Sequence, residues 1–220
     1  LARVRYCLLT HEHSDHLDLS NFESRHNASG PNGTPHLQFY ATADALNLVA
    51  TRFGVGPFPG GFDNARVAER LNLSAHAVTP FQKLEFGPYH VFSLLANHGS
   101  GKLLPLVYVV EEAGRRLLYC TDTGPLPEET WTALRAFGRP IHVVALDHTF
   151  GLKPAREGHL NRDQFVSQIE RLRAEHVLAE DARVFAHHLG HHSNPSHPGL
   201  VEVTARDGYD VAYDGLTVTV

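Results

Sequence analysis

The chain has 220 residues, a length that fits one domain, and we expect residues 1–220 to form a single domain. Its net charge is −5, and its 19 Lys and Arg residues form no basic block, so nucleic acid is not an expected partner. No run approaches the roughly 18 apolar residues that a membrane span requires. The two cysteines, Cys7 and Cys120, each lie in an apolar run, which indicates buried thiols in a reduced, cytoplasmic compartment.

Predicted strands and helices alternate along the chain. Short apolar runs predict strands at 4–9, 37–41, 88–96, 104–111, 115–120, 141–146, 182–186, 209–213 and 216–220. Periodic apolar positions predict helices at 43–53, 64–71, 127–137, 161–177 and 198–206. The clearest helix is Gln164 to Val177, where Phe165, Ile169, Leu172 and His176 recur at three- and four-residue steps. Asn161 and Gln164 give this helix a start that resembles a capping box.

Four side chains that can bind a metal ion follow the first predicted strand. They are His11, His13, Asp15 and His16, in the pattern HxHxDH. Imidazole and carboxylate form a mixed nitrogen and oxygen ligand set that zinc and related divalent ions accept. A structural zinc site normally closes with four ligands and often uses cysteine, whereas this cluster has no cysteine and enough ligands to share between two ions. The motif therefore favours a two-metal hydrolytic site.

Three later predicted strands also end in a residue that can bind a metal ion. These residues are His98, Asp122 and the adjacent pair His187 and His188. A lone histidine in a protein of this length is usually a surface or core residue. Three strand ends that each carry a candidate ligand, in addition to HxHxDH, strengthen the prediction of a metal site.

The order HxHxDH, His, Asp, His resembles that of the metallo-β-lactamase fold superfamily, whose α/β fold is an αββα sandwich. Further segments narrow the resemblance to the phosphoribosyl cyclic phosphodiesterases of phosphonate utilisation. These segments are Asn97-His98, Leu118 to Pro127, Leu146-Asp147-His148, Gly158 to Asn161 and Arg183 to His191. Members of this family usually have two strands ahead of HxHxDH, so we expect this chain to lack the first strands of the fold at its amino terminus.

The resemblance implies a pair of divalent metal ions. It assigns His11, His13 and His98 to one ion, and Asp15, His16 and His188 to the other, with Asp122 bridging the two. Because two histidines stand side by side at the last position, His187 is the alternative to His188. Zn²⁺ is the expected ion from the ligand types, and Mn²⁺ fits a pair of sites that contains carboxylates nearly as well.

The resemblance also implies catalytic roles for Asp15 and His159. Relatives have a histidine at the position of His159 that reaches toward the substrate, as a general acid or as a donor to phosphate oxygens. The alternative is that His159 hydrogen-bonds near the start of the helix and orients a ligand. Asp147 and His148, after the strand at 141–146, either support the site or have no chemical role.

The implied function is hydrolysis of a small or cyclic phosphodiester by a hydroxide that bridges the metal ions. Composition agrees, because a ribonuclease Z-like nuclease would need a basic patch for its polyanionic substrate. A thioesterase or lactonase would use the same ligands, and a non-catalytic metal-binding relative from cofactor biosynthesis is a further alternative. The expected partner is the small-molecule substrate, and the sequence is compatible with a homodimer.

Overall fold

We describe the protein from a computed structural model, in residues 3–18, 20–27, 35–54, 71–99 and 104–220. The chain divides into two compact units, Leu1–Thr79 and Pro80–Val220, and each unit has its own hydrophobic core. The expectation of one domain over residues 1–220 stays a prediction. In the described part of the chain, every helix is too short or too polar to cross a membrane.

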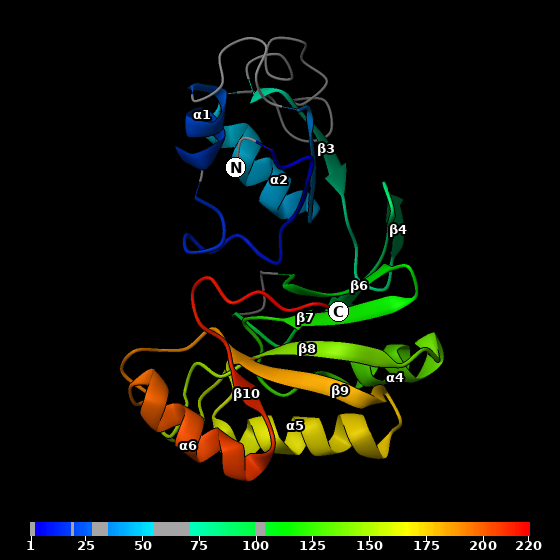
Figure 1. Cartoon of the computed structure of the whole chain (residues 1–220). Helices are drawn as coiled ribbons and strands as arrows, with labels where there is room; N and C mark the ends of the chain where they lie inside the picture. Colours follow the sequence, from blue (N-terminus) through cyan, green and yellow to red (C-terminus); the bar gives the residue numbers. More distant parts are fainter. Residues whose placement is uncertain (1–2, 19, 28–34, 55–70, 100–103) are drawn as a thin grey trace. The chain divides into compact units, whose positions relative to one another are not determined.

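The first unit contains a parallel sheet in the order β1-β2-β3, flanked by helices (Figure 1). Its elements are β1 (Tyr6–Leu8), α1 (Ser20–Asn27), β2 (Leu37–Ala41), α2 (Ala43–Arg52) and β3 (Leu73–Ala77). Alternate residues of β2 are buried, as expected for a strand with one face on the core. Phe39 of β2 and Leu46 of α2 are both fully buried in this core, which holds the helix on the sheet.

The second unit contains a seven-stranded sheet in the order β10-β9-β8-β7-β6-β5-β4. Its strands are β4 (Lys83–Phe86), β5 (Tyr89–Leu95), β6 (Leu106–Glu112), β7 (Arg115–Cys120), β8 (Ile141–Asp147), β9 (Leu178–His187) and β10 (Asp210–Val211). Its helices are α4 (Glu128–Phe137), α5 (Arg162–Ala174) and α6 (His197–Asp207). Trp131 of α4 and Phe165 of α5 are buried with Leu118 and Val144 of the sheet, and α6 lies beside β10 (Figure 1).

The strand directions in the second unit bring the carboxyl ends of several strands to one edge of the sheet. β5 and β7 both run antiparallel to β6, and β7, β8 and β9 run parallel to one another. The carboxyl ends of β5, β7, β8 and β9 therefore point the same way. We call this side the carboxyl edge, and its polar residues are His98, Asp122, Asp147 and His188. Ligand sites of open α/β sheets commonly form at such an edge.

Some elements differ from the sequence prediction. The predicted strand at 216–220 is wrong, because these residues follow a turn at Asp214–Gly215 and form no strand in the described structure. Strand propensity produces a strand only where a neighbouring backbone can pair with it. The predicted helix over 161–177 ends at Ala174, because His176 has a left-handed backbone with φ of +55°.

Three observed elements, α1, β3 and β4, have no counterpart among the predicted ones. β4 illustrates the reason. Its sequence Lys-Leu-Glu-Phe alternates exposed and half-buried residues, and β4 is the last strand at one edge of the sheet. Charged residues are typical of edge strands but are depleted in strands generally, so this sequence does not indicate a strand by itself. The predicted helix at 64–71 lies outside the described residues except for Leu71.

Candidate metal centre

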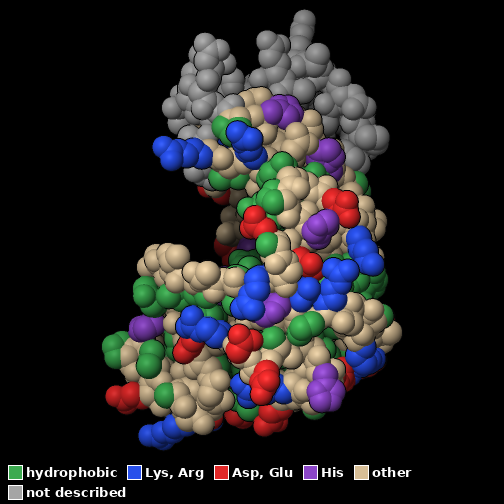
Figure 2. Space-filling model, turned by 45° about the vertical axis from the view of Figure 1, so that its right-hand side comes forward, with side chains coloured by type: hydrophobic (Ala, Val, Ile, Leu, Met, Phe, Trp, Pro, Cys, Tyr) green, Lys and Arg blue, Asp and Glu red, His purple; other side chains and the backbone are tan. Residues whose placement is uncertain are grey.

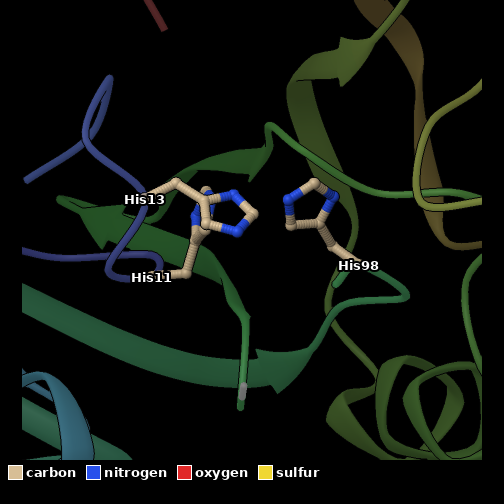
Figure 3. A group of neighbouring side chains, drawn as sticks. All are labelled: His11, His13 and His98. Carbon is tan, nitrogen blue, oxygen red and sulfur yellow. The ribbon is translucent and has the colours of Figure 1, made fainter. Parts of the chain in front are cut away.

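The histidines of the HxHxDH motif lie close together on the loop that follows β1. The Nε2 atom of His11 is 2.9 Å from Nδ1 of His13, and the rings of His11 and His16 are 4.3 Å apart between centroids. Figure 3 shows the His11 and His13 imidazoles side by side on this loop. Ligand nitrogens of a tetrahedral zinc ion are about 3.3 Å apart when each Zn–N bond is about 2.05 Å. The His11–His13 pair is therefore close to the spacing that a metal ion requires.

The loop geometry follows from a tight turn. The backbone N–H groups of His16 and Leu17 both donate to the carbonyl of His13, which turns the chain back so that His16 returns to His11. The Thr10 hydroxyl lies 3.1 Å from Nδ1 of His11 and orients this ring. Asp15 sits at the tip of the turn with 64% of its side chain exposed, 3.5 Å from Nε2 of His16. The turn thus gathers the motif's three histidines and its carboxylate.

His98 follows β5 and is held by the loop that carries His159. Its Nδ1 lies 2.8 Å from the carbonyl oxygen of Gly158, so Nδ1 carries the hydrogen and Nε2 keeps its lone pair for a metal ion. Figure 3 shows the His98 ring on the loop beyond β5. Gly158 has φ of +82°, and a Cβ atom there would lie 3.2 Å from His98 Nδ1. This position therefore requires glycine for both its backbone and its contact with His98.

The loops after β5 and β7 are tied to each other. The backbone N–H of Asn97 donates to the Thr123 hydroxyl at 3.0 Å, and the N–H of Gly124 donates to the Asn97 carbonyl at 2.8 Å. The Asn97 side chain adds a hydrogen bond to the carbonyl of Pro125. His98 follows Asn97 and Asp122 precedes Thr123, so these bonds fix the positions of His98 and Asp122 relative to each other.

Asp122 and His188 meet at the carboxyl edge. Asp122 is 2% exposed, and its Oδ1 is 3.1 Å from Nδ1 of His188. Both residues have left-handed backbones, with φ of +48° and +54°. This conformation is uncommon outside glycine and is concentrated at functional sites. His187, the alternative ligand, is the last residue of β9, and its ring contacts that of Tyr119 at 5.5 Å. The geometry therefore favours His188, although the assignment of the last ligand stays a prediction.

Asp147, the last residue of β8, connects these groups. Its side chain is fully buried, and its Oδ1 accepts hydrogen bonds from the backbone N–H groups of Thr149 and Leu160 at 3.0 and 2.9 Å. Its Oδ2 lies 2.9 Å from Nδ1 of His159 and accepts from the Thr149 hydroxyl at 2.9 Å. The same hydroxyl is 2.8 Å from Nδ1 of His188. Both imidazoles thus donate from Nδ1 toward Asp147, His159 directly and His188 through Thr149, so their Nε2 atoms are directed away from it.

Sequence reasoning left the role of Asp147 open and missed Thr149 entirely. The only signal was a short run, Asp147-His148-Thr149, after a buried strand. The neighbouring residue His148 points elsewhere: its ring nitrogens bond the Asn194 amide oxygen at 2.9 Å and the Tyr209 hydroxyl at 3.0 Å. Burial lowers the pKa of His148, which keeps it neutral in this structural role.

The donor set fits divalent cations on chemical grounds. Asp122 and Asp147 are buried carboxylates whose ligand atoms, with those of His159 and His188, all lie within 4.8 Å of one another. Burying two negative charges so close together is costly unless cations or hydrogen bonds compensate them. Asp147 is compensated by its four donors, whereas Oδ1 of Asp122 lies 3.3 Å from Nδ1 of His159 and 3.1 Å from Nδ1 of His188. A divalent ion beside Asp122 would balance its charge.

The second cysteine takes no part in this chemistry. Cys120 is fully buried at the end of β7, and burial, followed by the Asp147 carboxylate, raises the pKa of its thiol far above the ordinary value. The thiolate is the form that binds metals and acts as a nucleophile. Cys120 therefore stays protonated and serves as a core residue, as its apolar sequence context predicts. Cys7 is also a free thiol.

An α/β fold with candidate histidine and aspartate ligands after the ends of its strands defines the class as a metallo-β-lactamase fold protein. The family model described as the beta-lactamase superfamily domain matches residues 1–180, and the chain belongs to this superfamily. The family resemblance and the fold class predicted from the sequence are thereby confirmed at the level of the superfamily.

Solved structures agree in fold. Unliganded yeast PDE1 is 14% identical, with a TM-score of 0.70 over 96% of this chain and 67% of that chain. Zn²⁺-bound PqqB from Methylobacterium extorquens is 16% identical, with a TM-score of 0.66 over 98% of this chain and 73% of that chain. YhfI from Bacillus subtilis, a metallo-β-lactamase fold protein, is 17% identical, with a TM-score of 0.65 over 98% and 76%. No curated protein sequence matches the chain.

Proposed function

We propose that the protein is a metal-dependent hydrolase of a small or cyclic phosphodiester. The observation that carries the proposal is the hydrogen-bonded pair of Asp147 and His159, which adjoins the candidate ligands Asp122 and His188. The metal ligands are those that the sequence resemblance assigns: His11, His13, Asp15, His16, His98, Asp122 and His188. Two divalent ions, with Zn²⁺ expected first and Mn²⁺ second, would activate water and neutralise charge on phosphoryl oxygens when bound.

In this proposal His159 is the general acid. Water adds its oxygen to phosphorus, the bond from phosphorus to one alcohol oxygen breaks, and the alcohol leaves with a proton from Nε2 of His159. Asp147 accepts the Nδ1 hydrogen of His159 at 2.9 Å, which directs Nε2 toward the reacting group. A buried carboxylate in this position also stabilises the protonated imidazole. The proton that water releases restores the acid form of His159, so the cycle balances.

Two further observations support a small substrate. On the face that Figure 2 shows, basic and acidic side chains are interspersed, as the scattered arginines of the sequence lead us to expect. A nuclease of long chains would need a basic surface along the phosphate backbone. The name of the yeast structure, PDE1, is compatible with phosphodiester chemistry in this fold. The free thiols of Cys7 and Cys120 fit the cytoplasmic location that we propose.

Acyl hydrolysis is the competing proposal, because a thioesterase or lactonase would use the same ligands. The His159–Asp147 pair distinguishes a phosphodiester from a thioester. An alkoxide that leaves a phosphodiester is strongly basic and needs a proton, whereas a thiolate is weakly basic and leaves without one. A proton donor beside the candidate ligands therefore favours the phosphodiester over the thioester, and the assay below separates it from a lactone, whose leaving group is also an alkoxide.

The test uses protein loaded with Zn²⁺ or, separately, with Mn²⁺, and offers bis(p-nitrophenyl) phosphate, a cyclic ribose phosphate, a thioester and a lactone. We expect metal-dependent cleavage of both phosphodiesters, and a loss of at least about 10²-fold in kcat for Asp122→Ala. His159→Ala should lower kcat by about 10²–10⁴-fold on the cyclic phosphate and by much less on the p-nitrophenyl ester, whose leaving group needs no proton. The matched control is Asp163→Ala, because the Asp163 side chain is 86% exposed.

Each alternative gives a different result in this assay. Turnover of the thioester or the lactone alone would assign the protein to the acyl hydrolases. No turnover of any substrate by protein that binds two metal ions would support the non-catalytic alternative. Equal losses on both phosphodiesters in His159→Ala would contradict the general-acid role but not the phosphodiesterase activity.

A further inference from the structure

A cavity of about 680 Å³ opens beside His188 in the second unit. It extends from this candidate ligand along the loop that follows β9, past the start of α6, to the segment after β10. A molecule that fills the cavity would therefore have one end at His188, whose Nδ1 lies 3.1 Å from Oδ1 of Asp122. The cavity is large enough for a drug-sized organic group and much larger than a phosphate needs.

The lining chemistry suits a neutral ring. Tyr213 and His197 both line the cavity, with ring centroids 5.5 Å apart at an angle of 84°. Tyr213 as a residue is 58% exposed, which leaves it accessible to a ligand. Among the described residues that line the cavity there is neither lysine nor arginine, and Asp214 contributes a negative charge. A second phosphate or a polyanion would be repelled there, whereas an uncharged planar group can pack on the two rings.

Polar groups are also present for recognition. Ser196 is the residue before α6, but its side chain makes no capping hydrogen bond to the helix. Ser196 lines the cavity, and a serine hydroxyl can donate to or accept from a polar substituent. Leu189 and Leu200 supply apolar surface on the same cavity. This combination of aromatic, apolar and hydroxyl groups resembles the usual composition of pockets for organic ligands.

We infer that this cavity binds a neutral, ring-bearing alcohol group of the phosphodiester, as in a nucleoside ester. The phosphoryl group then lies at the His188 end, and the ring of the alcohol packs against Tyr213 and His197. The inference rests on the proposed function and specifies its substrate class. Simple alkyl diesters are consequently poor substrates, and a planar group with polar substituents is preferred.

The test compares two diesters with the same leaving group, methyl p-nitrophenyl phosphate and thymidine 5′-(p-nitrophenyl phosphate), in metal-loaded protein. We expect kcat/KM to be at least about 10-fold higher for the thymidine ester, which is the range of one base stacked on an aromatic ring. Tyr213→Ala and, independently, His197→Ala should bring this ratio close to one, whereas Tyr213→Phe should retain it because the ring is preserved. A ratio near one in the unmodified protein, or one unchanged by Tyr213→Ala and His197→Ala, overturns the inference.

A binding measurement separates this inference from the proposed function. Saturation-transfer NMR with thymidine as the probe requires no turnover. If neither ester is cleaved, the phosphodiesterase proposal fails, and the cavity is then judged by binding alone. Thymidine binding that is lost in Tyr213→Ala but kept in Tyr213→Phe supports the ring site. Absence of binding, or binding that is unaffected by Tyr213→Ala, overturns it.

Discussion

The carboxylate of Asp147 accepts four hydrogen bonds and, directly or through Thr149, fixes the ring orientations of His159 and His188. Asp147→Asn keeps the size of the side chain but replaces one acceptor oxygen with a donor. We expect kcat on a diester with an alkoxide leaving group to fall by about 10–100-fold, as for partners of metal-site imidazoles. In a His159→Ala background the same change should cost much less, because the two residues act as a unit.

Rates and metal content, measured for both single variants and the double variant, check this prediction. Asp163→Asn, on the exposed first turn of α5, is the matched control. Losses that simply multiply in the double variant would show that Asp147 does not act through His159. Thermal unfolding of each variant shows whether the fold is intact.

Gly158 offers a second prediction at a single residue. Gly158 and Gly114 have nearly the same φ, +82° and +80°, but an added Cβ atom lies near His98 at position 158 and meets nothing within 4 Å at position 114. Alanine at either position should lower the free energy of unfolding by about 1 kcal/mol. Only Gly158→Ala should also weaken Zn²⁺ binding, by about 10-fold, because it displaces the partner of His98. Chelator competition measures this affinity, and equal affinities in the two variants would contradict the role given to Gly158.

At the scale of elements, the hairpin of β6 and β7 depends on one partly buried ion cluster. Glu111 is 11% exposed, and its Oε2 is 2.9 Å from Nε of Arg116 and 3.1 Å from Nη1 of Arg139. Burial by itself raises the pKa of Glu111, but hydrogen bonds from Arg116 and Arg139 outweigh it, so the pKa lies below the ordinary value of 4.5. The charged form is therefore more favourable in the folded protein than in the unfolded chain.

This shift predicts the pH dependence of stability. Because the folded pKa is depressed, the contribution of Glu111 is fully present above about pH 4.5 and is lost as the pH falls through the folded value. Glu111→Gln should lower the free energy of unfolding by about 2 kcal/mol at pH 7, since it leaves Arg116, whose side chain is 12% exposed, without its charged partner. Below pH 4.5 the difference from the unmodified protein should shrink. Glu112→Gln, at the exposed neighbouring position, is the control and should show neither effect.

At the scale of the whole molecule, metal binding should stabilise the folded chain. An ion that binds only the folded state, at a free concentration of about 100 times its Kd, adds about 2.7 kcal/mol to the free energy of unfolding. We therefore expect chelation to lower the unfolding temperature and re-addition of Zn²⁺ to restore it. Calorimetry with and without a chelator measures this shift. The shift should be smaller in Asp122→Asn, which weakens the proposed bridging ligand, and a full shift in that variant would contradict the ligand assignment.

The sequence alone determined the superfamily and most of the second unit's elements. A metal-ligand motif after an apolar strand is a local pattern, so His11, His13, Asp15 and His16 can be read directly from the chain. The start of α5 is equally local: Asn161 and Gln164 form the predicted capping box, with the Gln164 N–H donating to Asn161 at 3.0 Å. The prediction of a strand at 216–220 was wrong because strand formation depends on a partner strand, which a local sequence pattern does not describe.

The tertiary structure alone decided how the site's residues support one another. The directions of β5, β7, β8 and β9 bring His98, Asp122, Asp147 and His188 to one edge, although they are separated by up to 90 residues along the chain. The contacts of His98 with Gly158 and of Thr149 with His188 join loops that follow different strands. Sequence spacing predicts contacts within a strand, a helix or a turn, whereas contacts between strand ends depend on the order and direction of the strands in the folded sheet.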